Sequence, residues 1–283
     1  MTLIEAGHTF TIIAGALRDH KVTVQKLDRD HYVNLKTGET LEYQHTENRA
    51  QSSHYVRQSL RQGRDTINAN VTAENVQKTR WVTLTYAENM TDPKRLKRDF
   101  DEFNRRFHKR YGSYEYITAA EPQGRGAWHL HVILIFPEHA PFLLPEEVSE
   151  AWRQGFVKIK KIDSCDNVGA YLSAYLGDLE VDEDCHGSEV KEVTAQIGSS
   201  EKKRVVKGAR LALYPPGMHI FRYSKGIKKA TRSVLPYCKA KEKAGGGSPT
   251  YSSAFQLQGD GFSTTLVKEH YNTQRKKSQD GET

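Results

Sequence analysis

The segment from Trp128 to Phe136 reads WHLHVILIF and is the most strand-like run of the chain. Successive side chains of a β-strand point to opposite faces, so His129 and His131 share one face and the apolar residues between and after them take the other. We therefore expect a buried strand that carries two imidazoles on one side, about 7 Å apart. Such a pair supplies half of a divalent-metal site.

A carboxylate stands where it could complete that site. Glu121 follows another strand-like run, residues 114–120, and seven residues separate it from His129. Between them, PQGRGA has the composition of a hairpin turn, which could return the second strand beside the first and bring Glu121 near the histidines. Two imidazoles and a carboxylate suit Mg²⁺ or Mn²⁺ bound with open positions better than a closed structural zinc site.

The histidine pair also has more ordinary interpretations. Two histidines on a strand are more often satisfied by hydrogen bonds than by a metal. Iron or manganese sites of the cupin type also begin with two histidines one residue apart, but they require a glutamate four or five residues later. Ile135 and Phe136 occupy those positions here, which disfavours a cupin. By itself the pair leaves the function open.

A second motif, VGAYLSAYLGD at residues 168–178, has the pattern of a helix with Asp166 as a plausible N-cap. Tyr171 and Tyr175 are four residues apart and therefore neighbours on its surface. Tyrosines beside leucines commonly pack at the edge of a core, but a tyrosine hydroxyl can also act as a covalent nucleophile. Together with an upstream metal site, the pair suits attack on a phosphodiester. The expected apolar stripe of this helix is Val168, Leu172, Leu176 and Leu179.

These segments resemble, in the same order, three motifs of the HUH endonucleases, specifically rolling-circle replication initiators of phage and plasmid type. Residues 81–86, WVTLTY, resemble their first strand motif. The His129-Leu-His131 triplet with its upstream Glu121 resembles the second, and the helix with the two tyrosines resembles the third. Residues 221–227, FRYSKGI, which follow a Tyr-Pro-Pro-Gly segment, are similar to the stretch that closes this domain. The resemblance covers roughly residues 78–230.

The resemblance implies a mechanism. A metal held by His129, His131 and Glu121 would polarise the scissile phosphate. A tyrosine hydroxyl would then attack phosphorus, giving a 5′-phosphotyrosine link and a free 3′-hydroxyl, and the same site could rejoin ends without ATP. Tyr175 is the expected nucleophile, because it lies nearer the apolar stripe and its spacing matches the family, and Tyr171 is the second choice. The implied partners are single-stranded DNA at a replication origin and a host helicase and polymerase.

Motif order and one departure define the alternatives. Conjugative relaxases carry the tyrosine before the histidines, whereas both tyrosines follow them here, as in replication initiators and transposases. These families usually place a lysine beside the tyrosine or one turn after it, where this chain has Ala174 and Asp178. A tyrosine transposase, a mobilisation nickase and a catalytically inactive origin-binding regulator therefore stay open. The positive charge that this lysine supplies in the family would come from Lys158, Lys160 or Lys161 here, or this chain has no such charge.

The charge of the chain agrees with a polyanionic partner, since the formal net charge is +7. Residues 92–110 have the pattern of an amphipathic helix whose other positions are crowded with Lys and Arg. That basic face is either a solvated surface or a phosphate contact, and the second interpretation predicts strong salt dependence. The expected DNA-binding residues are Arg105, Arg106, Lys158 and Lys160.

The alternation of elements predicts an α+β fold with helices packed on an antiparallel sheet. The resemblance implies that this is a central sheet of about five strands, as in the RRM-like fold of HUH endonucleases. The pattern favours helices on one face of the sheet, and the resemblance implies that the histidines lie on its exposed face with the tyrosine helix beside it. The expected strands are residues 79–86, 114–121, 128–136 and 156–162, and the expected helices are residues 93–111, 145–154 and 167–179.

Three segments are expected along the chain. Residues 1–77 form an N-terminal appendage that is β-rich and then a basic helix, residues 78–235 the catalytic domain, and residues 236–283 a linker and disordered tail. Three widely spaced cysteines indicate neither a disulfide framework nor a zinc signature, which favours a reducing cytoplasm. No run has transmembrane length, no signal peptide is evident and no membrane partner is expected.

Overall fold

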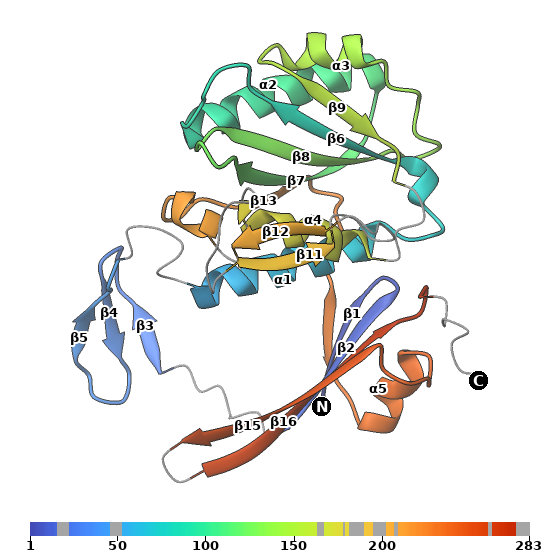
Figure 1. Ribbon diagram of the computed structural model, residues 1–283. Helices are drawn as coiled ribbons and strands as arrows, with labels where there is room; N and C mark the ends of the chain where they lie inside the picture. Colours follow the sequence, from blue (N-terminus) through green and yellow to red (C-terminus); the bar gives the residue numbers. More distant parts are fainter. Residues whose placement is uncertain are drawn as a thin grey trace.

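The computed structural model describes residues 1–15, 23–45, 53–162, 167–177, 179–180, 190–194, 202–206, 209–259 and 262–275. Its main feature is a five-stranded sheet, the central sheet, in the order β13-β7-β8-β6-β9 (Figure 1). All four pairings are antiparallel, which confirms the predicted α+β class. The strands are β6 (Thr79–Thr85), β7 (Glu115–Pro122), β8 (Trp128–Ile135), β9 (Val157–Lys160) and β13 (Phe221–Tyr223).

Strand β8 occupies the middle of this sheet, as its nearly continuous apolar sequence requires. The predicted turn before it is present. The Gln123 amide donates to the Ala127 carbonyl at 2.7 Å, and Gly126 has a φ of 90°, which a residue with a side chain rarely adopts. This turn sets the register in which Glu121 lies opposite His129.

One face of the sheet is covered by α2 (Pro93–Tyr111) and α3 (Pro145–Trp152) (Figure 1). Helix α2 begins where the Asp92 side chain accepts a hydrogen bond from the Lys94 amide at 2.8 Å, and Gly112 ends it with a φ of 77°. Its apolar side chains pack among themselves and against Trp152, and burial of each contributes about 1.5–3 kcal/mol. The buried apolar residues of α2 are Leu96, Phe100, Phe103 and Phe107.

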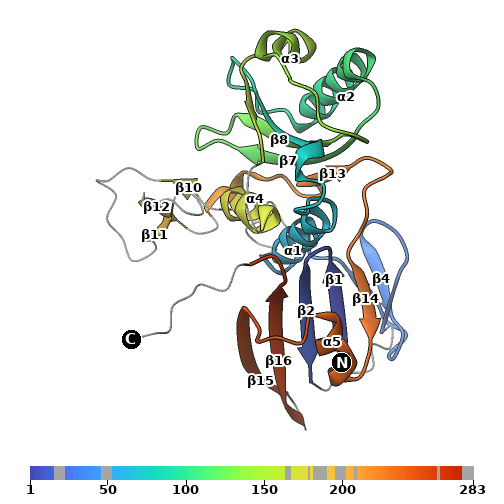
Figure 2. The same cartoon turned by 90° about the vertical axis from the view of Figure 1, so that its right-hand side faces the viewer.

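The opposite face is also covered, by α1 (Ser53–Asn70) and α4 (Val168–Gly177) (Figures 1 and 2). The prediction of helices on one face is therefore wrong. Glycines make the second layer possible, because a Cβ at Gly63 would lie 2.3 Å from the Phe221 ring and one at Gly169 would lie 2.4 Å from the Arg64 carbonyl oxygen. Helix α1 thus packs against the histidine-bearing face of the central sheet.

A second five-stranded sheet, the accessory sheet, has the order β14-β1-β2-β16-β15. It joins the two ends of the chain, since β16 pairs with β2 and β14 pairs with β1. The predicted linker and disordered tail are thus wrong for residues 237–259 and 262–272. Buried Tyr271 packs against Leu3 and Ile12, partners so distant in sequence that local composition cannot reveal them. The elements are β1 (Thr2–Ala6), β2 (Thr9–Ala14), β14 (Thr231–Val234), α5 (Tyr237–Lys243), β15 (Tyr251–Gly259) and β16 (Phe262–Asn272).

Two small sheets complete the description. The N-terminal one has the order β3-β4-β5, and Gly38, with a φ of 74°, lies in the turn between β4 and β5. The other has the order β10-β12-β11. How the chain divides into folding units stays a prediction. The elements are β3 (Val24–Lys26), β4 (His31–Asn34), β5 (Thr40–Glu42), η2 (Val76–Lys78), β10 (Leu179–Glu180), β11 (Val190–Thr194), β12 (Lys202–Val206) and η3 (Ala209–Leu213).

A membrane-spanning helix would need both length and an apolar sequence. Within the described ranges, no helix combines the two.

Candidate active site

Three predicted ligands meet on the face of the central sheet that α1 and α4 cover. The Nε2 atom of His129 lies 2.8 Å from Glu121 Oε2, and the Nε2 atom of His131 lies 2.6 Å from the same oxygen. The potential ligand atoms of the three residues all fall within 4.8 Å of one another. The group could therefore hold a metal ion.

Polar side chains on strand β6 and in the turn after β7 contact the two imidazoles. Thr83 Oγ1 on β6 lies 3.3 Å from His131 Nδ1, and the Gln123 side-chain amide lies 3.4 Å from His129 Nδ1. Trp81 contacts the His131 ring edge-on, with 5.5 Å between the ring centroids. Contacts at Nδ1 leave each Nε2 directed at Glu121, and such outer partners tune the affinity of metal-ligating histidines.

The site is sheltered from solvent. The Glu121 side chain is 5% exposed and each imidazole 15%. Burial lowers the pKa of His129 to about 4. Burial first, and then the nearby His129 and Lys160, lower the pKa of His131 to about 3. Both imidazoles are thus neutral near pH 7, the form that binds a metal.

Arg210 is a functional candidate that the sequence reasoning did not find. Its guanidinium lies in η3 and forms an ion pair with Glu121 Oε1, the carboxylate oxygen that the histidines do not contact. The side chain is 13% exposed, and burial lowers its pKa. The one available signal was its position four residues before Tyr214, in the Tyr-Pro-Pro-Gly segment.

Tyr214 ties η3 to both the sheet and the tyrosine helix. Its buried hydroxyl lies 2.8 Å from the carbonyl oxygen of Ala120 and 3.1 Å from that of Leu176. Ala120 precedes Glu121 on β7, and Leu176 lies in the last turn of α4. The C-terminal end of α4 is therefore held beside the end of β7 that carries the metal-site carboxylate.

Helix α4 carries the two candidate nucleophiles. Val168, Leu172 and Leu176 are buried, at 4%, 1% and 1% exposure, as the predicted stripe requires. The prediction is wrong for Leu179, the fourth member, because the helix ends at Gly177 and Leu179 lies in strand β10. Asn167 caps the helix, because its side-chain oxygen accepts a hydrogen bond from the Ala170 amide at 2.8 Å, whereas Asp166, the expected N-cap, lies outside the described residues. The side chains of Tyr171 and Tyr175 lie outside the described part of the structure as well, so their roles stay predictions.

Lys158 and Lys160 lie on the same face of the sheet as the histidines. Lys158 pairs with Thr83, which in turn pairs with His131, and Lys160 pairs with Trp81. Residues directly opposite one another on neighbouring strands share a face. Both lysines are exposed on edge strand β9, so they could meet a phosphate chain that approaches the metal group.

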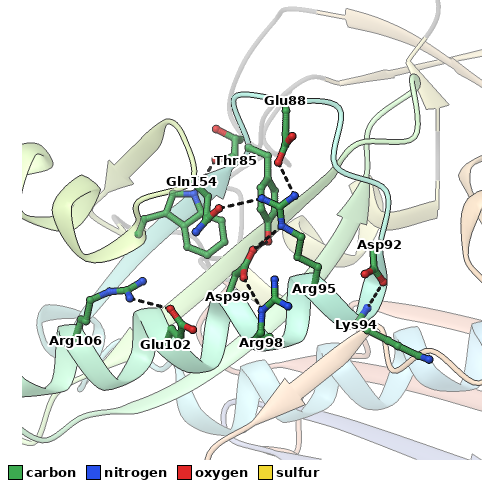
Figure 3. Close-up of polar contacts among 12 residues, drawn as sticks. Thr85, Glu88, Asp92, Lys94, Arg95, Arg98, Asp99, Glu102, Arg106 and Gln154 are labelled. Carbon is green, nitrogen blue, oxygen red and sulfur yellow. Dashed lines mark hydrogen bonds and ion pairs between the residues drawn. The ribbon is translucent and has the colours of Figure 1, made fainter.

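Arg105 and Arg106 lie on α2, across the sheet from the histidines. Arg105 is exposed, whereas Arg106 is 18% exposed and held by the protein. Its Nε donates to the Ala151 carbonyl at 2.7 Å, and its guanidinium pairs with Glu102 at 3.0 Å (Figure 3). The structure therefore does not bring these two arginines together with the metal group. Their contact with DNA stays a prediction.

Comparison with known proteins agrees with this geometry. Residues 79–180 match the replication-associated protein ORF2 family. The matched segment runs from β6 to β10 and includes the metal group and both tyrosines. No curated protein and no solved structure matches the chain. Over this segment the chain is similar to replication-associated proteins, and the match together with the metal group indicates a nuclease-type activity on DNA.

Proposed function

We propose that this protein is a rolling-circle replication initiator that nicks single-stranded DNA at an origin and joins itself to the 5′ end. One observation carries the proposal. The side chains of Glu121, His129 and His131 meet on the sheet face that α4 covers, inside the segment that matches replication-associated proteins. A purely structural histidine pair would not require a buried carboxylate between the two imidazoles.

The residues present fit a hard divalent cation. Two neutral imidazoles and one carboxylate provide three ligands, so other coordination positions would be left for water or a phosphate oxygen. Mg²⁺ and Mn²⁺ are the ions we propose. When bound, such an ion supplies Lewis-acid polarisation of the scissile phosphate.

The protein's own residues would perform the transfer. The hydroxyl oxygen of Tyr175 would form a bond to phosphorus while the bond from phosphorus to the 3′ oxygen breaks. The proton lost by the tyrosine would end on that 3′ oxygen, which becomes a free hydroxyl for a polymerase. Reversal with a second DNA end rejoins the strand, because a phosphodiester is exchanged for a phosphodiester. A second hydroxyl, on Tyr171, would serve a later cleavage.

Cations around the site would offset the charge of the phosphate. The lysine expected beside the tyrosine is missing. Arg210 contacts Glu121, and Lys158 and Lys160 lie on the same face of the sheet as the histidines. A guanidinium can bind two phosphate oxygens at once. We propose that Arg210 exchanges its contact with Glu121 for the phosphate when DNA and metal bind.

Mass spectrometry of a trapped adduct tests the function directly. The full chain would be incubated with Mn²⁺ and single-stranded oligonucleotides that tile the replicon encoding it. We expect one oligonucleotide to yield a covalent adduct on Tyr175. The His129→Ala, His131→Ala double variant should form none while still binding the oligonucleotide, since binding depends on many phosphate contacts.

Two results would contradict the proposal. Full cleavage by the double-histidine variant in EDTA would exclude the metal. Tight binding of an oligonucleotide with no adduct from any part of the replicon would indicate an origin-binding regulator that does not cleave.

Glu121→Gln should shift the Mn²⁺ titration to higher concentration, and an unchanged titration would assign the third ligand to another residue.

A further inference from the structure

A groove of about 760 Å³ lies between helix α1 and the accessory sheet, away from the metal group. Figure 2 shows α1 directly above β1 and β2, with the central sheet on its other side. One wall of the groove is α1. The other comes from Tyr223 at the end of β13, from residues 229–232 that lead into β14, and from Ile4 of β1. Segments far apart in sequence therefore build it together.

Positive charge dominates the lining of this groove. Arg57 and Arg61 stand four residues apart on one face of α1, and Lys229 and Arg232 face them from the other wall. Within the described structure, Asp65 is the one acidic residue among those that line the groove, and it pairs with Arg64 at 3.4 Å. Four cations against one carboxylate that is already paired leave a large excess of positive charge.

The surroundings add to the excess. Burial, and then the positive charges of Arg61 and Arg64, lower the pKa of Lys268 on β16. Burial also lowers the pKa of Lys229, whose Nζ lies 3.4 Å from the centre of the Tyr223 ring. Cations held this close repel one another, which is unfavourable in the protein alone and is relieved when a polyanion binds.

We propose that this groove binds the sugar–phosphate backbone of duplex DNA beside the single strand that is cleaved. The identity of the nucleic acid rests on the proposed function; the preference for a polyanion rests on the groove. A duplex backbone fits better than a single strand, because single-strand grooves add exposed aromatic rings on which bases stack. Here the one aromatic residue in the lining is Tyr223, and Lys229 covers its ring.

Helix α1 connects the groove to the site. The side chain of Asn68 accepts a hydrogen bond from the Gly169 amide at 3.0 Å and donates to Asn167 at 3.0 Å, which fixes α1 to the start of α4. Arg57 and Arg61 lie on the same helix, toward its N-terminus. DNA held by those arginines is thus one helix away from the tyrosine helix, as expected for a duplex arm that flanks the nick.

The test compares the salt dependence of DNA binding by the full chain. Fluorescence anisotropy would follow a labelled duplex with a single-stranded arm, with wild-type protein and with the Arg57→Ala, Arg61→Ala variant. We expect the slope of log affinity against log salt to fall by about two and affinity to fall on the order of tenfold. Both arginines are exposed and alanine is a strong helix former, so the variant should fold, which circular dichroism checks.

A matched control removes the same charge elsewhere. Arg29→Ala with Lys36→Ala deletes two exposed cations from the β3-β4-β5 sheet and should leave the slope unchanged. Equal losses in the two variants would overturn the inference, because they would reflect net charge alone. The inference would also be overturned if the groove variant bound the duplex with wild-type affinity, or if it lost affinity only for single-stranded DNA. Displacement of the duplex by polyglutamate of equal total charge would overturn it as well.

Cleavage separates this inference from the proposed function. The Arg57→Ala, Arg61→Ala variant should still form the adduct on a short single-stranded oligonucleotide, which does not reach the groove. If wild-type protein forms no adduct but duplex affinity depends on the two arginines, the nicking proposal is wrong and the groove proposal stands. If the adduct forms but duplex affinity does not depend on the two arginines, the groove proposal is wrong and the nicking proposal stands.

Discussion

The hydroxyl of Tyr214 lies 3.1 Å from the carbonyl oxygen of Leu176 and so joins the last turn of the tyrosine helix to the segment that carries Arg210. The same hydroxyl lies 2.8 Å from the Ala120 carbonyl oxygen, next to the metal-site carboxylate. One phenol oxygen therefore sets the distance between the candidate nucleophile helix and the metal group.

Replacing Tyr214 by Phe should uncouple those elements. The change keeps the ring in its pocket and leaves two buried carbonyls without this donor, at a cost of about 1–3 kcal/mol in the free energy of unfolding. We expect adduct formation to slow more than metal binding weakens, because the metal ligands stay on β7 and β8. Denaturant unfolding and a Mn²⁺ titration would measure the two effects. Equal losses in both would mean that Tyr214 only stabilises the fold.

The contact of Gly63 with Phe221 gives a prediction about stability. A Cβ at Gly63 would lie 2.3 Å from the Phe221 ring, so Gly63→Ala should force α1 away from β13 and destabilise the protein by about 1–3 kcal/mol. The higher helix propensity of alanine offsets about 1 kcal/mol of this. Gly247→Ala is the control, because no atom lies within 4 Å of a Cβ there. Equal midpoints of unfolding for the two variants would refute the close packing.

The two arginines of α2 should behave differently from each other. Arg106 is held by Ala151 and Glu102, so Arg106→Ala should lower stability by about 1 kcal/mol through lost hydrogen bonds. Arg105 is exposed, so Arg105→Ala should leave stability within about 0.5 kcal/mol of wild type. If α2 contacts phosphates, the double variant should also reduce the salt slope of DNA binding by roughly one to two. An unchanged slope would show that neither arginine contacts DNA phosphates.

The sequence predicted the elements that build the metal group because their signals are local. The alternating pattern around His129, the turn before it and the stripe through Leu172 each lie within one element, and the structure has all three. The convergence of Glu121 with the histidines could also be predicted, since a short hairpin leaves little choice of register.

Long-range pairing could not be predicted in the same way. Strand β16 was expected to be disordered. It forms a hairpin with β15, but it joins the rest of the fold through β2, more than two hundred residues earlier. Arg210 was missed for a related reason. Its role is defined by contact with Glu121, and nothing within its own segment distinguishes it from other basic residues.

The two tyrosines of α4 give the last prediction. A nucleophile must reach a phosphate held at Glu121 and the histidines. Tyr175 adjoins Leu176, whose carbonyl is tied through Tyr214 to the strand end that bears Glu121. Tyr171 lies one turn earlier in the helix, about 6 Å along its axis. We therefore expect Tyr175→Phe to abolish the covalent adduct on a single-site oligonucleotide. Tyr171→Phe should allow the first nick and impair a second cleavage or strand closure.

Phenylalanine keeps the packing area of each ring and removes only the hydroxyl, so lost activity would not reflect misfolding. Peptide mapping of the adduct would identify the modified residue in each variant. An adduct that persists in Tyr175→Phe and disappears in Tyr171→Phe would reverse the assignment. An adduct that persists in the double variant would show that neither tyrosine of α4 is the nucleophile, and the search would move to another hydroxyl near the metal group.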